Sequence, residues 1–166
     1  TGPEPGVFHP PTATFLAELS KRAYETFKPG PLDPAWELVR RVDGFTLANL
    51  TGTQLDIWVN SRTDDVAIAF RGTEVDLERD TLRDLMTDAF ALPVGGFHAG
   101  FYRAFLSASP DLVAALAVRA RNPEARVYFT GHSLGGALAT IASLHLLPQL
   151  RLQGYDRENV VLYTFG

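Results

Sequence analysis

The sequence predicts a single α/β domain, because its composition is that of a globular protein and buried strands alternate with helices in its second half. The 166 residues are 46% hydrophobic and 20% charged, with 14 Gly, 11 Pro and no Cys. These values exclude a disordered, collagen-like or coiled-coil chain. Neither a fixed-period repeat nor an internal linker divides the sequence, so we expect one domain over residues 1–166.

Hydrophobic periodicity predicts the elements of the first half. Apolar residues at steps of three and four predict a helix over residues 14–27. Alternating apolar and polar residues then predict two amphipathic strands, at residues 45–50 and 55–59. They lead to a wholly apolar run at 66–70, which predicts a buried strand.

The second half alternates strand and helix. Ser109, followed by Pro110 and Asp111, is typical of a helix start, and that helix is expected to run to about Arg119. A buried strand at 127–130, a helix at 134–147 and a buried strand at 160–165 follow. Apolar strands separated by helices pair in parallel and are covered on both faces. The prediction is therefore a mostly parallel central sheet flanked by helices.

Charge and hydropathy exclude several classes of protein. Residues 74–88 hold six acidic and two basic side chains, and this net charge of −4 equals that of the whole chain. No Lys/Arg cluster is present, so nucleic acid is not an expected partner. We see no apolar run long enough to span a membrane and no signal-peptide pattern, and the compartment stays open. The absence of cysteine rules out disulfides and thiolate metal sites.

The segment Gly131-His132-Ser133-Leu134-Gly135 is the candidate for a catalytic site with a serine nucleophile. It matches G-x-S-x-G, in which a serine on a sharp turn from strand to helix presents its hydroxyl above the sheet edge. The glycines stand where a Cβ would collide across the turn. An ordinary helix cap by Ser133 is the alternative, but it would not explain glycines on both sides.

A nucleophilic serine also needs donors for the oxyanion. The Leu134 N–H lies at the start of the predicted helix, with the helix dipole behind it. A second donor is expected from the loop after an earlier strand, where Thr73 follows Arg71 and Gly72. The alternative is that Arg71 and Thr73 only satisfy the end of that strand.

Together these residues resemble the class 3 lipases, the fungal-lipase-like α/β-hydrolases. The resemblance covers residues 66–166 and rests on five segments in the family's order: Ala69–Glu74, Asp84–Asp88, Phe97–Ala104, Gly131–Ala139 and Tyr163–Gly166. It implies hydrolysis of acylglycerols or other lipid esters, with Ser133 as the nucleophile and Leu134 and Thr73 forming the oxyanion hole. It implies no cofactor, and it implies a lid in the segment after Thr73.

The sequence of residues 74–90 allows two interpretations without reference to the family. Their apolar residues recur at helical steps, which fits either a lid or an ordinary surface helix. The acidity disfavours docking on anionic membranes, so we expect a preference for soluble esters or neutral lipids at a lipid–water interface. Strong activation by anionic vesicles would contradict this. Asp76, Glu78 and Asp80 alternate like a calcium loop, but Thr81 and Thr87 stand where glycine and glutamate belong, so no metal is expected.

The acid and base of a Ser-Asp-His triad are not found in this sequence. His145 follows Ser133 by twelve residues of predicted helix, about 18 Å at about 1.5 Å per residue. Asp156 and Glu158 precede the last strand and are therefore expected at the opposite edge of the sheet. The remaining histidines are His9 in a Pro-rich segment, His98 and His132, and the resemblance gives His98 no catalytic role.

Two main explanations remain open. In the first, a further C-terminal portion of the polypeptide supplies the acid and base, so the fold appears truncated after residues 160–165 and residues 1–166 alone are expected to be nearly inactive. An apolar edge strand without a neighbour favours this explanation. In the second, the protein is a non-catalytic binding relative of the hydrolases. A third alternative keeps Ser133 but makes the reaction acyl transfer or thioester cleavage.

Overall fold

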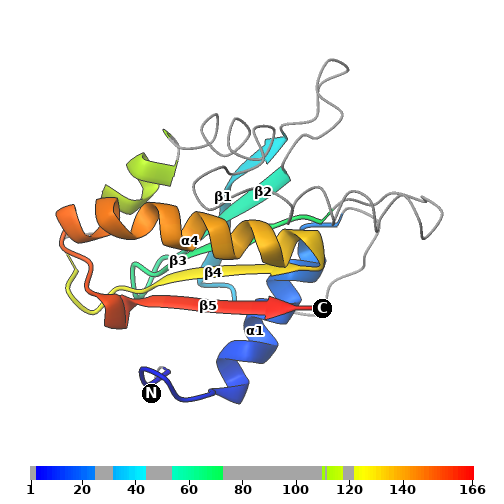
Figure 1. The fold of residues 1–166 in the computed structure, drawn as a ribbon, viewed down its shortest axis with the longest axis horizontal. Coiled ribbons are helices and arrows are strands. Elements are labelled where there is room, and N and C mark those ends of the chain that lie inside the picture. The colour runs from blue at the N-terminus through cyan, green and yellow to red at the C-terminus, as the bar shows by residue number, and fades with distance from the viewer. Residues whose placement is uncertain (1–2, 25–31, 44–53, 73–109, 111, 118–121) are drawn as a thin grey trace, which may run out of the picture.

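The computed structural model describes residues 3–24, 32–43, 54–72, 110, 112–117 and 122–166. Its elements in chain order are α1 (Pro10–Arg22), β1 (Trp36–Asp43), β2 (Gln54–Asn60), β3 (Val66–Phe70), β4 (Val127–His132), α4 (Leu134–Leu152), η1 (Arg157–Asn159) and β5 (Val160–Phe165) (Figure 1). Residues 112–117 are also helical, as expected. The expected strand at 45–50, Thr73, the segment 74–90 and His98 lie outside the described residues.

Five strands form one sheet in the order β1-β2-β3-β4-β5. β1, β2 and β3 are joined by antiparallel pairing, whereas β3–β4 and β4–β5 pair in parallel. The expected parallel pairing is thus confirmed for the half of the sheet that contains Ser133. Because β3, β4 and β5 all end at one edge, the residues that follow them are brought together there.

Helices cover both faces of the sheet, with α4 on one side and α1 on the other (Figure 1). The side chains of β3 point alternately toward the two faces of the sheet, so this strand contributes to the core under each helix. Val66, Ile68 and Phe70 point into the core beneath α4, whereas Ala67 and Ala69 point into the smaller core beneath α1. Since successive side chains of a strand face opposite ways, one short apolar run fills both cores, and its small residues lie on the α1 side.

Helix α1 begins four residues earlier than the periodicity predicts. Pro10 and Pro11 occupy its first turn, where a missing N–H costs no intrahelical bond and the fixed φ favours the helix. Leu16 and Leu19 are fully buried against the sheet, as their spacing predicts. The Ser20 hydroxyl donates to the Leu16 carbonyl and lies 3.0 Å from the Thr130 hydroxyl of β4, a buried polar contact between helix and strand.

Helix α4 is longer than the predicted 134–147, because it continues through Pro148. Proline removes the hydrogen bond to the carbonyl four residues earlier, that of Leu144, which belongs to an exposed residue. Leu146 and Leu150 are buried on either side of the proline and hold the last turns against the sheet. No helix in the described parts of the chain combines the length and apolarity needed to cross a membrane.

Strands β1, β2 and β5 differ from the sequence-based expectation. A buried strand is expected at 160–165, but every residue of β5 is partly or fully exposed. The sequence does not predict β1, because this strand is rich in charged residues and a β-bulge between Leu38 and Arg40 breaks its alternation. β2 is not amphipathic, since all seven of its residues are buried. Its Asp56 is fully buried because Arg41, directly opposite on β1, donates two hydrogen bonds of 2.7 Å to the carboxylate.

The Arg41–Asp56 pair gives a test of what joins β1 to the sheet. Replacing Arg41 with Ala leaves the fully buried Asp56 carboxylate without its ion-pair partner, so we expect the free energy of unfolding to fall by about 3–5 kcal/mol. The control is Arg62→Ala, which removes the exposed ion pair with Asp33 and should cost no more than about 1 kcal/mol. Chemical denaturation measures both. Equal losses in the two variants would contradict a structural role for the buried pair.

Candidate active site

Ser133 lies on a tight turn between strand and helix. β4 ends at His132 and α4 begins at Leu134, so the serine alone connects them. Its φ of 55° and ψ of −123° lie in a region that non-glycine residues rarely adopt, at a cost on the order of 1–3 kcal/mol. Hydrogen bonds hold the turn: the Ser133 N–H donates to the Phe165 carbonyl of β5 at 2.7 Å, and the Ser133 carbonyl accepts from the Gly136 N–H at 2.9 Å. The residue is exposed at the carboxyl edge of the parallel strands.

Glycines make this turn possible. A Cβ on Gly131 would lie 2.2 Å from the Gly135 carbonyl oxygen, and a Cβ on Gly135 would lie 2.3 Å from the Phe70 carbonyl oxygen of β3. Both contacts are with backbone, which cannot rotate away as a side chain can. The two glycines that flank Ser133 in the sequence therefore let the first turn of α4 lie directly on the ends of β3 and β4.

The first turn of α4 offers a donor beside Ser133. The serine side chain makes no capping hydrogen bond. Within the described parts of the chain the Leu134 N–H also has no acceptor, as expected for the first residue of a helix. The partial positive charge at the N-terminus of this 19-residue helix therefore lies next to the serine hydroxyl. This arrangement can bind an anion such as a tetrahedral oxyanion.

The loop after β3 meets the turn of Ser133. Gly72 is buried, and a Cβ added there would lie 2.9 Å from the carbonyl oxygen of His132 and 3.4 Å from the N atom of Gly135. Thr73, the expected second donor, is the next residue and lies outside the described part. The structure thus brings the beginning of the Thr73 loop to the turn, although the two segments are about sixty residues apart in the sequence.

Sequence reasoning missed Tyr24, which lies just beyond the C-terminus of α1. Its hydroxyl accepts a hydrogen bond from the Gly72 N–H at 3.2 Å. Its ring packs edge-on against His132, with centroids 6.3 Å apart, and the Arg71 guanidinium lies over the ring at 5.6 Å. A single tyrosine at the end of a helix belongs to no sequence motif, so only the tertiary structure shows that Tyr24 lies beside Ser133.

The other candidate histidines and acids lie elsewhere or have other contacts. His145 is half-buried on α4, and the His9 Nδ1 atom is 2.7 Å from the Thr12 hydroxyl. Val127 pairs with Val160 and His132 pairs with Phe165, so Asp156 and Glu158 lie at the opposite edge of the sheet from Ser133, as expected. Among the described residues, no three His, Asp or Glu side chains are placed to hold a metal ion.

Two groups with raised pKa values lie at the edge of the sheet away from Ser133. Burial raises the pKa of Asp65, just before β3, although its carboxylate accepts a 2.7 Å hydrogen bond from the Arg126 N–H. Burial and the nearby Asp65 carboxylate raise the pKa of Tyr128. These shifts arise where the strands begin, and they have structural causes.

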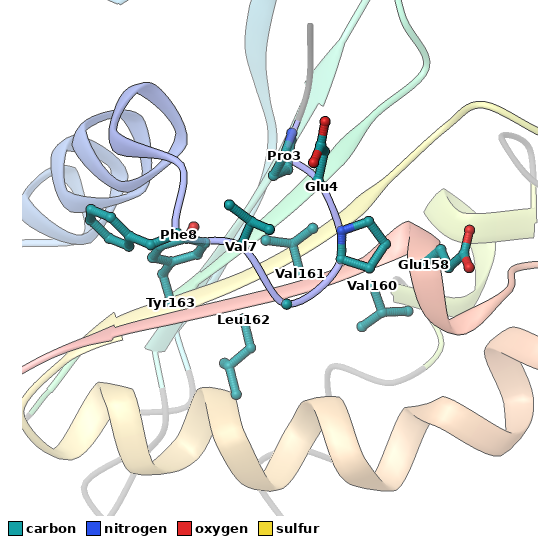
Figure 2. A pocket seen from close by; sticks show the side chains of 11 residues that line it. Pro3, Glu4, Val7, Phe8, Glu158, Val160, Val161, Leu162 and Tyr163 are labelled. Atoms are coloured by element: carbon teal, nitrogen blue, oxygen red, sulfur yellow. The ribbon is translucent and has the colours of Figure 1, made fainter.

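A cavity of about 390 Å³ lies between the N-terminal segment and β5. Figure 2 shows Pro3, Glu4 and Val7 on one side, with Val161 and Tyr163 of the strand on the other. Phe8 contacts the Tyr163 ring, and the His9 N–H donates to the Tyr163 hydroxyl at 3.0 Å. Ser133 and Leu134 do not line this cavity.

A serine on a strained turn between a parallel strand and a helix is the arrangement of the α/β-hydrolase fold. Comparison with solved structures agrees: the lipase of Rhizopus microsporus var. chinensis superimposes with a TM-score of 0.66 at 24% identity, over 93% of this chain and 56% of that one. The family model described as lipase (class 3) matches residues 67–166. The chain belongs to the class 3 lipase family.

Two curated relatives are lipases. A secreted mono- and diacylglycerol lipase of Fusarium solani is 39% identical over 72 residues, which are 43% of this chain and 20% of that protein. A lipase of Rhizomucor miehei is 31% identical over 109 residues, which are 61% of this chain and 28% of that protein. The matched part of the chain therefore spans less than a third of the length of either relative.

The close backbone contact at the turn can be tested by a single methyl group. Because a Cβ on Gly131 would overlap the Gly135 carbonyl, we expect Gly131→Ala to destabilise the protein by about 3 kcal/mol or more, or to prevent folding. Gln149→Ala is the control, since this side chain is exposed on α4. Thermal unfolding of the two variants gives the comparison. A Gly131→Ala protein as stable as the control would show that the turn differs from the one described.

Proposed function

We propose that this chain carries the nucleophile and part of the oxyanion hole of a serine ester hydrolase that acts on acylglycerols or other lipid esters. The observation that carries the proposal is the exposed Ser133 on a strained turn, directly before the N-terminus of α4. Membership of the class 3 lipase family supports the reaction class. The relative from Fusarium solani, described as a mono- and diacylglycerol lipase, supports the substrate class.

The proposed reaction passes through an acyl-enzyme. The Ser133 hydroxyl oxygen attacks the carbonyl carbon of the ester while a general base takes its proton. The Leu134 N–H donates to the resulting oxyanion, with Thr73 as the expected second donor. The C–O bond to the alcohol then breaks, the alcohol takes the proton from the base, and water releases the acyl group from Ser133. These steps need no cofactor and no metal.

The source of the general base distinguishes this proposal from a second one. His9 contacts Thr12, His132 packs on Tyr24, and His145 is about 18 Å along α4 at about 1.5 Å per residue. None of these three histidines is therefore proposed as the general base for Ser133. The second candidate is a non-catalytic relative that uses the same site for binding. Labelling of the serine separates the two, because only an activated hydroxyl reacts with a phosphonate.

The experiment uses the full-length protein, because residues 1–166 alone are expected to be nearly inactive. The purified protein is treated with a fluorophosphonate, and its intact mass and its hydrolysis of a p-nitrophenyl ester are measured. We expect one phosphonyl group, mapped to Ser133. We expect Ser133→Ala to lose the label and to lose hydrolysis by about 10⁴-fold or more. Ser61→Ala is the control, since its hydroxyl lies on an exposed turn and contacts the Ala35 carbonyl.

Either of two results would count against the hydrolase. Labelling at another serine, or hydrolysis that survives in Ser133→Ala, would remove Ser133 as the nucleophile. A folded protein that neither reacts with the phosphonate nor hydrolyses the ester would favour the binding relative. Release of the acyl group to an added alcohol or from a thioester, in preference to water, would indicate the acyltransferase or thioesterase alternative.

A further inference from the structure

Tyr24 connects three segments that meet beside Ser133. It follows the last turn of α1, where its N–H donates to the Lys21 carbonyl at 3.0 Å. Its hydroxyl contacts the loop after β3, and its ring contacts the residue before Ser133. The buried contact between Ser20 and Thr130 ties α1 to β4 only one turn of helix away. The position of Tyr24 is therefore set by α1 and its contact with β4, and not by the loop after β3 that the tyrosine contacts.

The hydroxyl acts on Gly72 at close range. The Gly72 N–H donates to it at 3.2 Å, and a Cβ on this residue would lie 2.6 Å from the same oxygen. A side chain at position 72 would thus displace the tyrosine hydroxyl. The hydroxyl thus occupies the space that a side chain would need, and it holds the peptide that joins Arg71 to Gly72 at the end of β3.

Orientation of Gly72 matters because its carbonyl carbon is bonded to the nitrogen of Thr73. An oxyanion donor stabilises the transition state only when it is held in the productive direction before the reaction. The Arg71 guanidinium over the Tyr24 ring adds a second contact, on the residue preceding Gly72. Two consecutive residues of the loop are thus held by one aromatic side chain.

We propose that Tyr24 is a positioning residue, whose hydroxyl and ring hold residues 71–72, the residues just before the proposed second oxyanion donor in the sequence, against the Ser133 turn. The inference rests on the proposed function, since it assigns Tyr24 a role in the same reaction. It predicts an effect on the transition state and little effect on substrate binding. The residue itself touches no reacting atom.

The test is Tyr24→Phe in the intact enzyme, because phenylalanine keeps the ring contacts with His132 and Arg71 and removes the hydroxyl alone. Tyr163→Phe is a matched control: the Tyr163 hydroxyl also accepts a backbone N–H, that of His9 at 3.0 Å, away from Ser133. With a p-nitrophenyl ester, we expect Tyr24→Phe to lower kcat about 10- to 100-fold with KM changed less than about threefold. The control should keep wild-type kcat, and the two variants should lose similar amounts of thermal stability.

Three results would overturn the proposal. The first is equal kcat in Tyr24→Phe and Tyr163→Phe. The second is a rise in KM at unchanged kcat, which would make the hydroxyl a substrate contact. The third is a loss of activity that only tracks a larger loss of folded protein. Hydrolysis that persists in Ser133→Ala would refute the proposed function itself. For the tyrosine variants, the rate that remains in Ser133→Ala is therefore subtracted before kcat is compared.

Discussion

Contact between backbone atoms of α4 and the ends of β3 and β4 is the constraint on which the site depends. Gly135 lies so close to the Phe70 carbonyl that any side chain would have to displace it, and Gly131 has the same relation to Gly135. The first turn of α4 can therefore lie on the sheet edge with no side chain between them. This contact places Ser133 above the edge and brings Gly72 next to the same turn.

Packing elsewhere offsets the strain that this geometry stores. The conformation of Ser133 costs on the order of 1–3 kcal/mol, whereas each fully buried leucine contributes about 1.5–3 kcal/mol. Leu138, Leu146 and Leu150 attach the whole length of α4 to the large core. On the other face, Ala67 and Ala69 of β3 lie under α1, whose C-terminus carries Tyr24. The layer of α4 thus holds the serine, and the layer of α1 holds the tyrosine.

The two edges of the parallel strands have different chemistry. At the amino edge, burial raises the pKa values of Asp65 and Tyr128 within a network that joins β3 to β4. At the carboxyl edge lie the exposed Ser133 and the unpaired N–H of the first α4 residue, within the described part of the chain. The raised pKa values of Asp65 and Tyr128 therefore mark a structural junction, whereas the edge proposed to be functional is distinguished by backbone conformation and helix polarity.

Features that depend on neighbouring residues follow from the sequence alone: the buried strands β3 and β4, the presence but not the burial of β5, the two helices that cover the sheet, and the glycine-flanked serine between strand and helix. Local periodicity shows which faces are buried, and glycine spacing shows where backbone must approach backbone. Tertiary structure alone decided the features that depend on distant partners. Asp56 is buried because Arg41 lies opposite it across a bulged strand, and Tyr24 meets Gly72 from 48 residues away. No local pattern encodes such pairs, because the contact exists only after the sheet and both helical layers have formed.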